Sequence, residues 1–265
     1  MSLLDRSRVI DSVPKYAFYK FCKSDKIVDA SNLKLPATTL ALGCYSSMFF
    51  GCTNLTTAPE LPATTLATEC YSSMFSGCTS LTTAPALPAT TLADKCYYYM
   101  FYNCTSLTTA PALPATTLAN YCYSTMFSGC TSLTTAPELP ATTLAESCYY
   151  KMFSGCTKLK SAPKLPATKL VIQCYYSMFS GCKSLTTAPD LPAQTLAIRC
   201  YNFMFDNCSS LNYIKMLATD ISASDCLGSW VFGVSTTGTF VKSSSATWNI
   251  VGNSGVPKDW NVITE

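Results

Sequence analysis

Sixteen cysteines are the residues of this 265-residue chain with the most evident chemical potential. Fourteen of them form seven pairs with a spacing of eight, such as Cys70 and Cys78, and the pairs recur every 26 residues from Cys44 to Cys208. Thiols arranged in this way could form disulfides, hold a metal, act as nucleophiles or simply pack. Because the chain contains no histidine, Cys-His and Ser-His-Asp catalysis and most zinc ligand sets are excluded.

The segment from Cys70 to Cys78, CYSSMFSGC, predicts how the thiols are used. Cys70, Met74 and Cys78 lie four residues apart, which predicts the apolar side of a short helix. Such a helix would hold the two cysteine Cα atoms about 12 Å apart, whereas a disulfide needs less than roughly 7 Å. We therefore expect buried, reduced thiols that pack as small hydrophobic side chains. Disulfides between neighbouring copies, and a metal site without a CxxC motif, stay open as alternatives.

The cysteine spacing belongs to a repeat of 26 residues, and Leu-Pro recurs with the same period from Leu35 to Leu191. After the predicted helix, SLTTAP indicates a short strand, and two prolines per copy shape the corners. A single copy cannot bury both its helix and its strand, so the copies must stack. Strands stack at about 4.8 Å and helices pack at about 8–10 Å, which predicts a curved stack with the strands inside.

The two ends of the chain carry degenerate copies. Cys226, Trp230, Gly233 and Val234 continue the columns as an eighth coil, and YAFYKFC, residues 16–22, is a worn copy of the helix segment. Strands predicted in TGTFVKSS and WNVIT would close the stack. We expect an α/β fold: a curved, right-handed solenoid of about eight coils with short parallel strands, short helices and a C-terminal β cap. Its parts are an N-terminal cap at 1–34, the solenoid at 35–234 and the C-terminal cap at 235–265.

The helix segment and the leucine that follows it resemble the IGxxAFxxCxxL half of the BspA-type, or Treponema-type, leucine-rich repeat. Six positions correspond, in the family order Ile, Gly, Ala, Phe, Cys and Leu: Cys70, Tyr71, Met74, Phe75, Cys78 and Leu81. MFSGCTSL also resembles the MFxxCxxL repeat of related bacterial surface proteins, whereas LTTAPELPATTLATEC is three residues longer than the family's other half. The resemblance covers about residues 15 to 234. It implies a leucine-rich-repeat solenoid from the class of bacterial surface or secreted proteins, some of which are adhesins.

Composition excludes several classes of function. The 18 basic residues are scattered and the net charge is only +3, so the footprint of a nucleic-acid binder is missing. No run of 18 apolar residues could span a membrane, and no secretory signal is visible. Without paired carboxylates or a phosphate-binding glycine loop, we expect no enzyme activity, no catalytic residue, no metal and no cofactor.

The few positions that vary between copies are the candidate binding sites. The position before Leu-Pro, expected on or beside the concave strand face, carries charge in four of the six copies from Glu60 to Asp190, and outer helix positions carry aromatic rings that could anchor a partner or pack between helices. Threonine columns could form a solvent-facing sheet surface or a lattice for a repetitive ligand such as a glycan or ice. The aromatic positions are Phe50, Tyr98, Tyr99, Tyr102, Tyr121, Tyr150, Tyr176 and Phe203. The residues predicted to bind are Glu60, Glu138, Lys164, Asp190, Tyr98 and Tyr121.

The resemblance and the repeat together predict a non-catalytic cell-surface or secreted protein. It would present an extended face for adhesion to a protein or glycan on a host or neighbouring cell. The alternative is a structural spacer or assembly subunit, such as a surface stalk or a phage tail component, without a specific ligand. The extracellular or cell-surface location follows from the resemblance alone, and the sequence fixes neither the ligand nor the organism nor the oligomeric state.

Overall fold

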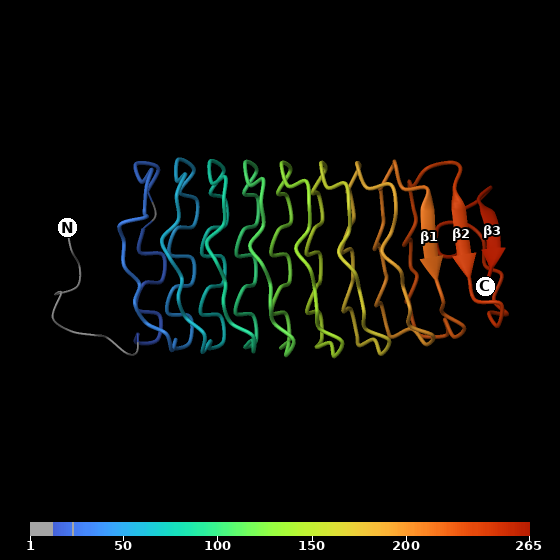
Figure 1. Cartoon of the computed structure of the whole chain (residues 1–265), viewed down its shortest axis with the longest axis horizontal. Helices are drawn as coiled ribbons and strands as arrows, with labels where there is room; N and C mark the ends of the chain where they lie inside the picture. The colour runs from blue at the N-terminus through green and yellow to red at the C-terminus, as the bar shows by residue number, and fades with distance from the viewer. Residues whose placement is uncertain (1–12, 23) are drawn as a thin grey trace.

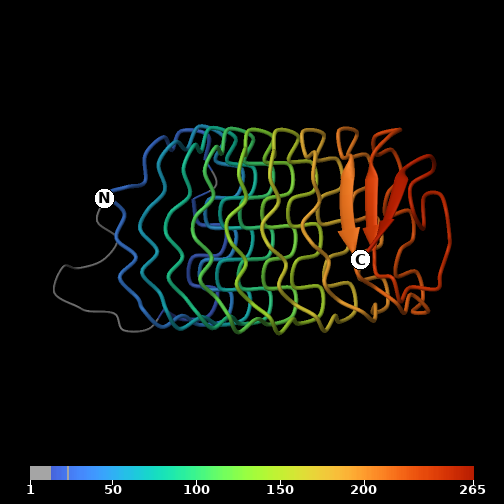
Figure 2. The same ribbon diagram turned by 45° about the vertical axis from the view of Figure 1, so that its right-hand side comes forward.

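The chain folds into coils stacked side by side along one long axis (Figure 1). The structure is a computed structural model and describes residues 13–22 and 24–265. It contains three strands in its described part, β1 (Tyr213–Met216), β2 (Thr239–Lys242) and β3 (Asn261–Thr264), and no helix. The strands form one parallel sheet in the order β1-β2-β3 at the C-terminal end of the stack (Figures 1 and 2). The solenoid is therefore observed, but without helices.

The segment predicted to be a helix is instead a run of turns, which we call the turn limb (residues 43–52 and their equivalents in other coils). Its backbone N–H groups alternate between two kinds of acceptor. The N–H of Met48 donates to the carbonyl of Tyr45 within the limb at 3.2 Å, and that of Ser47 donates to the carbonyl of Ser72 in the next coil at 2.7 Å. Every second amide thus bonds across coils, always toward the C-terminal end, which a helix does not allow.

Left-handed backbone at every fourth residue makes this path possible. In one turn limb the φ angles of Glu69, Ser73 and Gly77 are 57°, 54° and 76°. The last of these positions holds only glycine or asparagine, the residues that adopt the left-handed conformation most readily. The helix prediction was wrong because a spacing of four apolar residues fits both structures: successive turns of this kind also return every fourth side chain to the interior.

Replacing Ser73 with glycine is expected to raise the melting temperature slightly. A left-handed conformation costs an L-residue about 1–2 kcal/mol, which exceeds the roughly 0.5–1 kcal/mol of extra chain entropy that glycine loses on folding. In a helix the same change would destabilise by about 1 kcal/mol. Thermal unfolding of Ser73→Gly distinguishes the two structures. Ser72→Gly is the matched control, because Ser72 lacks a positive φ, and it should lower the melting temperature.

Aromatic rings stack in two columns inside the turn limbs. Ring centroids from Tyr45 to Tyr201 are 5.7–6.0 Å apart, and those from Phe49 to Phe205 are 5.5–5.8 Å apart. These steps are far below the 8–10 Å that packed helices require. The curved stack was predicted because helices pack farther apart than strands. That reason fails, because the turn limbs of neighbouring coils lie nearly as close together as strands do. Handedness stays a prediction.

The other side of each coil, which we call the strand limb, runs between successive turn limbs, for example over residues 53–68. Prolines explain why it contains few regular strands. Most coils contribute only isolated parallel bridges, such as Thr83 to Thr109 and Thr135 to Ser161. Each of these copies carries two prolines, which lack the N–H that a ladder needs. The segment Asn212–Asp220 contains no proline, and there β1 begins.

The last bridge of this column continues directly into the sheet. Thr187 pairs with Tyr213, Tyr213 with Thr239, and Thr239 with Asn261. The stack therefore runs without a break past residue 235, where a separate C-terminal cap was predicted to begin. All four residues of β3 are exposed, so a covering cap is not seen on this side, and the predicted boundaries at 34 and 234 stay predictions.

The cysteines pack as the sequence indicated. All sixteen are free thiols, and all except Cys22 are buried. The Sγ of Cys78 donates to the carbonyl of Phe49 at 3.2 Å, and the same bond recurs in each coil through Cys208. Burial raises the pKa of Cys70 and of Cys104 to about 12. The helix-based distance between paired cysteines no longer applies, but the thiols do form part of the core.

Candidate functional site

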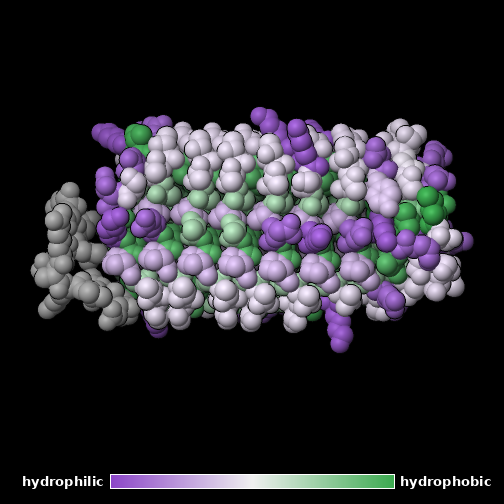
Figure 3. All heavy atoms as spheres, in the orientation of Figure 1, coloured by the Kyte–Doolittle hydropathy of each residue, from purple (hydrophilic) through white to green (hydrophobic). Residues whose placement is uncertain are grey.

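The charged residues predicted to bind lie in one exposed column of the strand limb. Glu60, Glu138, Lys164 and Asp190 are all exposed, and alanine takes their place in the two copies between Glu60 and Glu138. Side chains of like hydropathy run in rows along the long axis on the face seen in Figure 3. A shallow groove beside this column is lined by Pro111, Ala112, Pro114, Pro137, Glu138 and Pro140.

The charges of this column alternate in sign. They run negative, positive and negative through Glu138, Lys164 and Asp190 in successive coils. The column ends at Lys215, whose pKa is raised first by a hydrogen bond from its ammonium to Glu265 and further by Asp190. The Lys215 Nζ to Glu265 Oε1 distance is 2.6 Å. Among the described residues, no ion pair joins Glu138, Lys164 and Asp190 to one another.

The two predicted aromatic sites belong to a larger group on the outer surface of the turn limbs, which we call the tyrosine patch. Ring centroids are 4.3 Å apart between Tyr98 and Tyr99, and 4.8 Å apart between Tyr150 and Tyr176. Burial, followed by Tyr99 and then Tyr150 and Tyr121, raises the pKa of Tyr98 to about 12, so rings from three coils share one environment. The patch consists of Tyr98, Tyr99, Tyr102, Tyr121, Tyr150, Tyr176 and Phe203. It excludes Phe50.

A strip of small side chains lies between the rings. Ser124 is in the same column as Tyr98 and Tyr150, one coil from each. It is only 1% exposed, and its neighbour Thr125 is 3% exposed, although both lie on the outer side of the turn limb. Ser46, whose neighbours in the column are Lys20 and Ser72, is also buried at 7% exposed, so the burial of this strip belongs to the stack rather than to the rings.

Three patch residues adopt the left-handed backbone, where large side chains are unusual. The φ angles of Tyr99, Tyr121 and Phe203 are 56°, 57° and 55°. Serine holds the Tyr99 position at Ser73, and glycine holds the Tyr121 position at Gly43. The equivalent positions in other coils also have positive φ, for example Glu69, Ser73 and Lys151, so the left-handed backbone belongs to the repeat rather than to the patch.

Two lysines that the sequence did not single out border the patch. Lys95 Nζ lies 6.0 Å from the ring centroid of Tyr121, and Lys151 Nζ lies 5.4 Å from that of Tyr150. The hydroxyl of Tyr121 donates to Glu146 Oε1 at 3.2 Å. Lys151 could have been recognised from the sequence in the same way as the rings, because it departs from a column in which serine recurs. The patch thus combines rings, hydroxyls and flanking cations.

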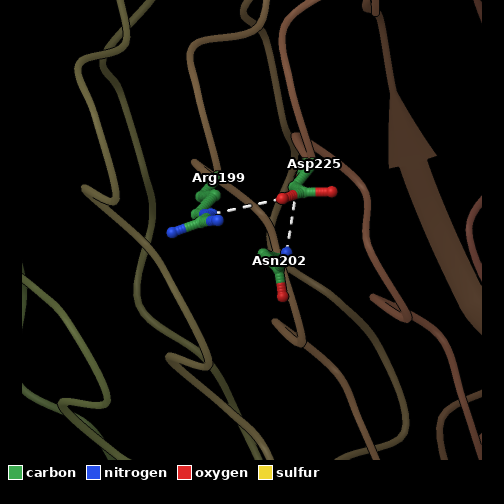
Figure 4. A network of polar contacts seen from close by, with 3 residues as sticks. All are labelled: Arg199, Asn202 and Asp225. Carbon is green, nitrogen blue, oxygen red and sulfur yellow. Dashed lines mark hydrogen bonds and ion pairs between the residues drawn. The ribbon is translucent and has the colours of Figure 1, made fainter.

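A small polar network follows the patch toward the C-terminus (Figure 4). Arg199 Nε donates to Asp225 Oδ2 at 3.2 Å, and Asn202 Nδ2 donates to the Asp225 carbonyl at 3.1 Å. Both charged side chains are half exposed, so the ion pair contributes less than about 1 kcal/mol. Gly228 leaves the space that the Asn202 side chain fills. The network ties the last two turn limbs together.

Other kinds of site have no counterpart in the part of the chain that the structure describes. No group of three or more His, Cys, Asp or Glu side chains is placed to hold a metal there. Likewise, the described residues include no helix with the length and apolar character to cross a bilayer. The tyrosine patch and the charged column are therefore the two candidate binding surfaces.

Comparison with known proteins identifies the repeat. The family model for the BspA type leucine rich repeat region matches in 6 copies, over residues 11–152 and 120–232. No curated protein matches, and neither does any solved structure. The matched residues make up most of the chain, and they are the residues that form the stacked coils. The chain therefore belongs to the BspA-type leucine-rich repeat family.

Proposed function

We propose that this protein is a non-catalytic, secreted or cell-surface adhesion protein that binds a protein or glycan through its tyrosine patch. The observation that carries the proposal is that these rings gather on one outer surface, at positions where other coils often carry serine. The family is typically surface-associated, which supports the location. The charged column with Glu60, Glu138, Lys164 and Asp190 stays a second predicted contact surface.

The stack does not need these rings. Serine occupies the Tyr98 position in three other coils, at Ser46, Ser72 and Ser124, and those coils stack with the same spacing of rings in the core. Six tyrosines and one phenylalanine close together on the outer surface are therefore an addition to the fold. Tyrosine presents a large, rigid, amphipathic surface that loses little side-chain entropy on binding, and it is enriched at binding hot spots.

The test is an array of glycans and extracellular-matrix proteins probed with the intact chain. For any ligand found, Tyr98→Ser combined with Tyr150→Ser should weaken binding about tenfold or more. Both changes install the residue that other coils carry, so the fold should be retained. The matched control is Phe50→Ser, which removes an exposed outer ring outside the patch and should leave affinity unchanged.

Two outcomes contradict the proposal. Undiminished binding by the double variant would place the contact elsewhere, with the charged column as the next surface to change. Silence across the array would favour the structural spacer, which needs no ligand.

A further inference from the structure

Exposed apolar side chains gather at the ends of the stack. Nine of the thirteen large hydrophobic residues that are exposed in the described part lie in the first or last coils. Such patches mark interaction surfaces when they are contiguous. Figure 3 shows strongly hydrophobic side chains at the C-terminal end. The five at that end are Phe232, Ile250, Val251, Val262 and Ile263.

The chain covers the turn-limb side of its C-terminal end but not the strand side. On the turn-limb side, residues 250–256 fold over the last coil: the N–H of Val231 donates to the Asn253 carbonyl at 3.2 Å, and Trp230 Nε1 donates to the Gly255 carbonyl at 2.8 Å. On the strand side, β3 is the last member of the ladder and every residue in it is exposed. Among the described residues, β3 pairs with β2 alone, so its outer edge has no strand partner.

The free edge of β3 lacks the features that protect edge strands. Its residues, Asn261, Val262, Ile263 and Thr264, include no charge and no proline, and their pairing with β2 is continuous, without a bulge. Natural edge strands are usually blunted by lysine, proline or a bulge. The N–H groups of Asn261 and Glu265 donate back to β2 and the residue preceding it, so the alternate amides of Val262 and Thr264 point away from the sheet.

The edge is complementary to a second copy of itself. The outward amides of Val262 and Thr264 fix the register: in an antiparallel arrangement about a two-fold axis, Val262 of one copy lies opposite Thr264 of the other, and Ile263 lies opposite Ile263. Glu265 then faces Asn261, so no like charges meet. Pairs of this kind stabilise strands, and two-fold contacts are the commonest in homo-oligomers.

Among the residues that the structure describes, the N-terminal end offers β3 no comparable partner. Its strand side begins with a single bridge at Asp29, which is charged, and its exposed rings, Tyr16, Tyr19 and Phe21, lie in the turn limb. Head-to-tail stacking would therefore bring β3 against an irregular segment. We propose that two copies of the protein associate through β3, so that two three-stranded sheets become one six-stranded sheet.

The test is the molar mass of the intact protein measured by sedimentation over a range of concentrations. The expected result is a reversible equilibrium between a 28.6 kDa monomer and a particle of twice that mass, which is weak because a four-residue edge buries little area. Val262→Lys combined with Ile263→Lys should keep the protein monomeric. Ile250→Lys, an exposed apolar residue at the same end but outside β3, should leave the equilibrium unchanged.

Amide exchange gives an independent readout. Protection of the Val262 and Thr264 amides should rise with protein concentration, while that of residues in the middle of the stack stays constant. A monomer at all concentrations would overturn the proposal. So would open-ended growth, a dimer that survives the double lysine change, or loss of the dimer in Ile250→Lys. Ligand binding by the tyrosine patch does not bear on any of these results.

Discussion

Raising the pH from 8 to about 10 is expected to unfold the protein in a steep transition. Fifteen cysteines are buried, and burial raises the pKa of each, Cys70, Cys104 and Cys130 among them. The unfolded chain releases these protons above about pH 9, while the folded chain keeps them, so the free energy of unfolding falls as the pH rises. The stabilisation is complete below pH 9 and is lost as the pH approaches the folded pKa values, which for Cys70 and Cys104 are about 12.

The expected size follows from proton linkage. One pH unit above the unfolded pKa, each buried thiol gives the unfolded state about 1.4 kcal/mol. Ten such groups together amount to about 14 kcal/mol, which is comparable to the 5–15 kcal/mol of stability that is usual for a domain. Buried tyrosines act in the same direction, because burial also raises the pKa values of Tyr45 and Tyr201.

Circular dichroism and tyrosine absorbance, followed together through an alkaline titration, measure this transition. Both signals should change at the same pH. A variant carrying Cys104→Ala and Cys130→Ala should show a less steep transition, since fewer protons are released on unfolding. Gradual tyrosine ionisation near pH 10 in a chain that stays folded would contradict the prediction.

Replacing Phe127 with alanine is expected to lower the free energy of unfolding by about 3–5 kcal/mol. Phe127 is fully buried, and its ring centroid lies 5.6 Å from that of Phe101 and 5.7 Å from that of Phe153. Truncation opens a cavity in the middle of the column, and the hydrogen bonds between coils hold the neighbouring backbones in place, so the column cannot close around it.

Chemical denaturation combined with amide exchange checks this effect. Exchange should accelerate most in the coil of Phe127 and in the two coils beside it, because repeat proteins are stabilised by contacts between nearest neighbours. The control is Ser128→Ala in the same turn limb, where the side chain is only half buried and the change should stay within about 0.5 kcal/mol. A loss below 1 kcal/mol for Phe127→Ala would argue against the stacked ring column.

Much of this architecture could be predicted from the period alone. Stacked columns of Tyr71, Phe75 and their equivalents, the buried thiols, the glycine or asparagine reversal and the eighth coil with Trp230 all follow from side chains that recur every 26 residues. A recurring position must face the same environment in each coil, so burial can be inferred without knowing the local backbone.

The backbone of the turn limb could not be predicted, because the same spacing of four serves helices and successive turns. The residues that decide between them are the left-handed ones, such as Glu69 and Ser73, and their types do not reveal this conformation. The candidate binding residues stay predictions. Tyr98 and Tyr121 stood out as departures from the columns, but their shared environment with Tyr150 depends on coils that only stacking brings together.

The hydrogen bonds between turn limbs have an electrostatic consequence for the whole molecule. In each limb, amides such as those of Tyr71 and Phe75 donate to carbonyls of the following coil, all in one direction. Their peptide dipoles therefore add along the solenoid axis, as dipoles add along a helix, but with the N–H ends toward the C-terminus. The stack carries positive polarity at its C-terminal end, where Asn253 and Ser254 supply oxygen acceptors to the last amides, and negative polarity at its N-terminal end.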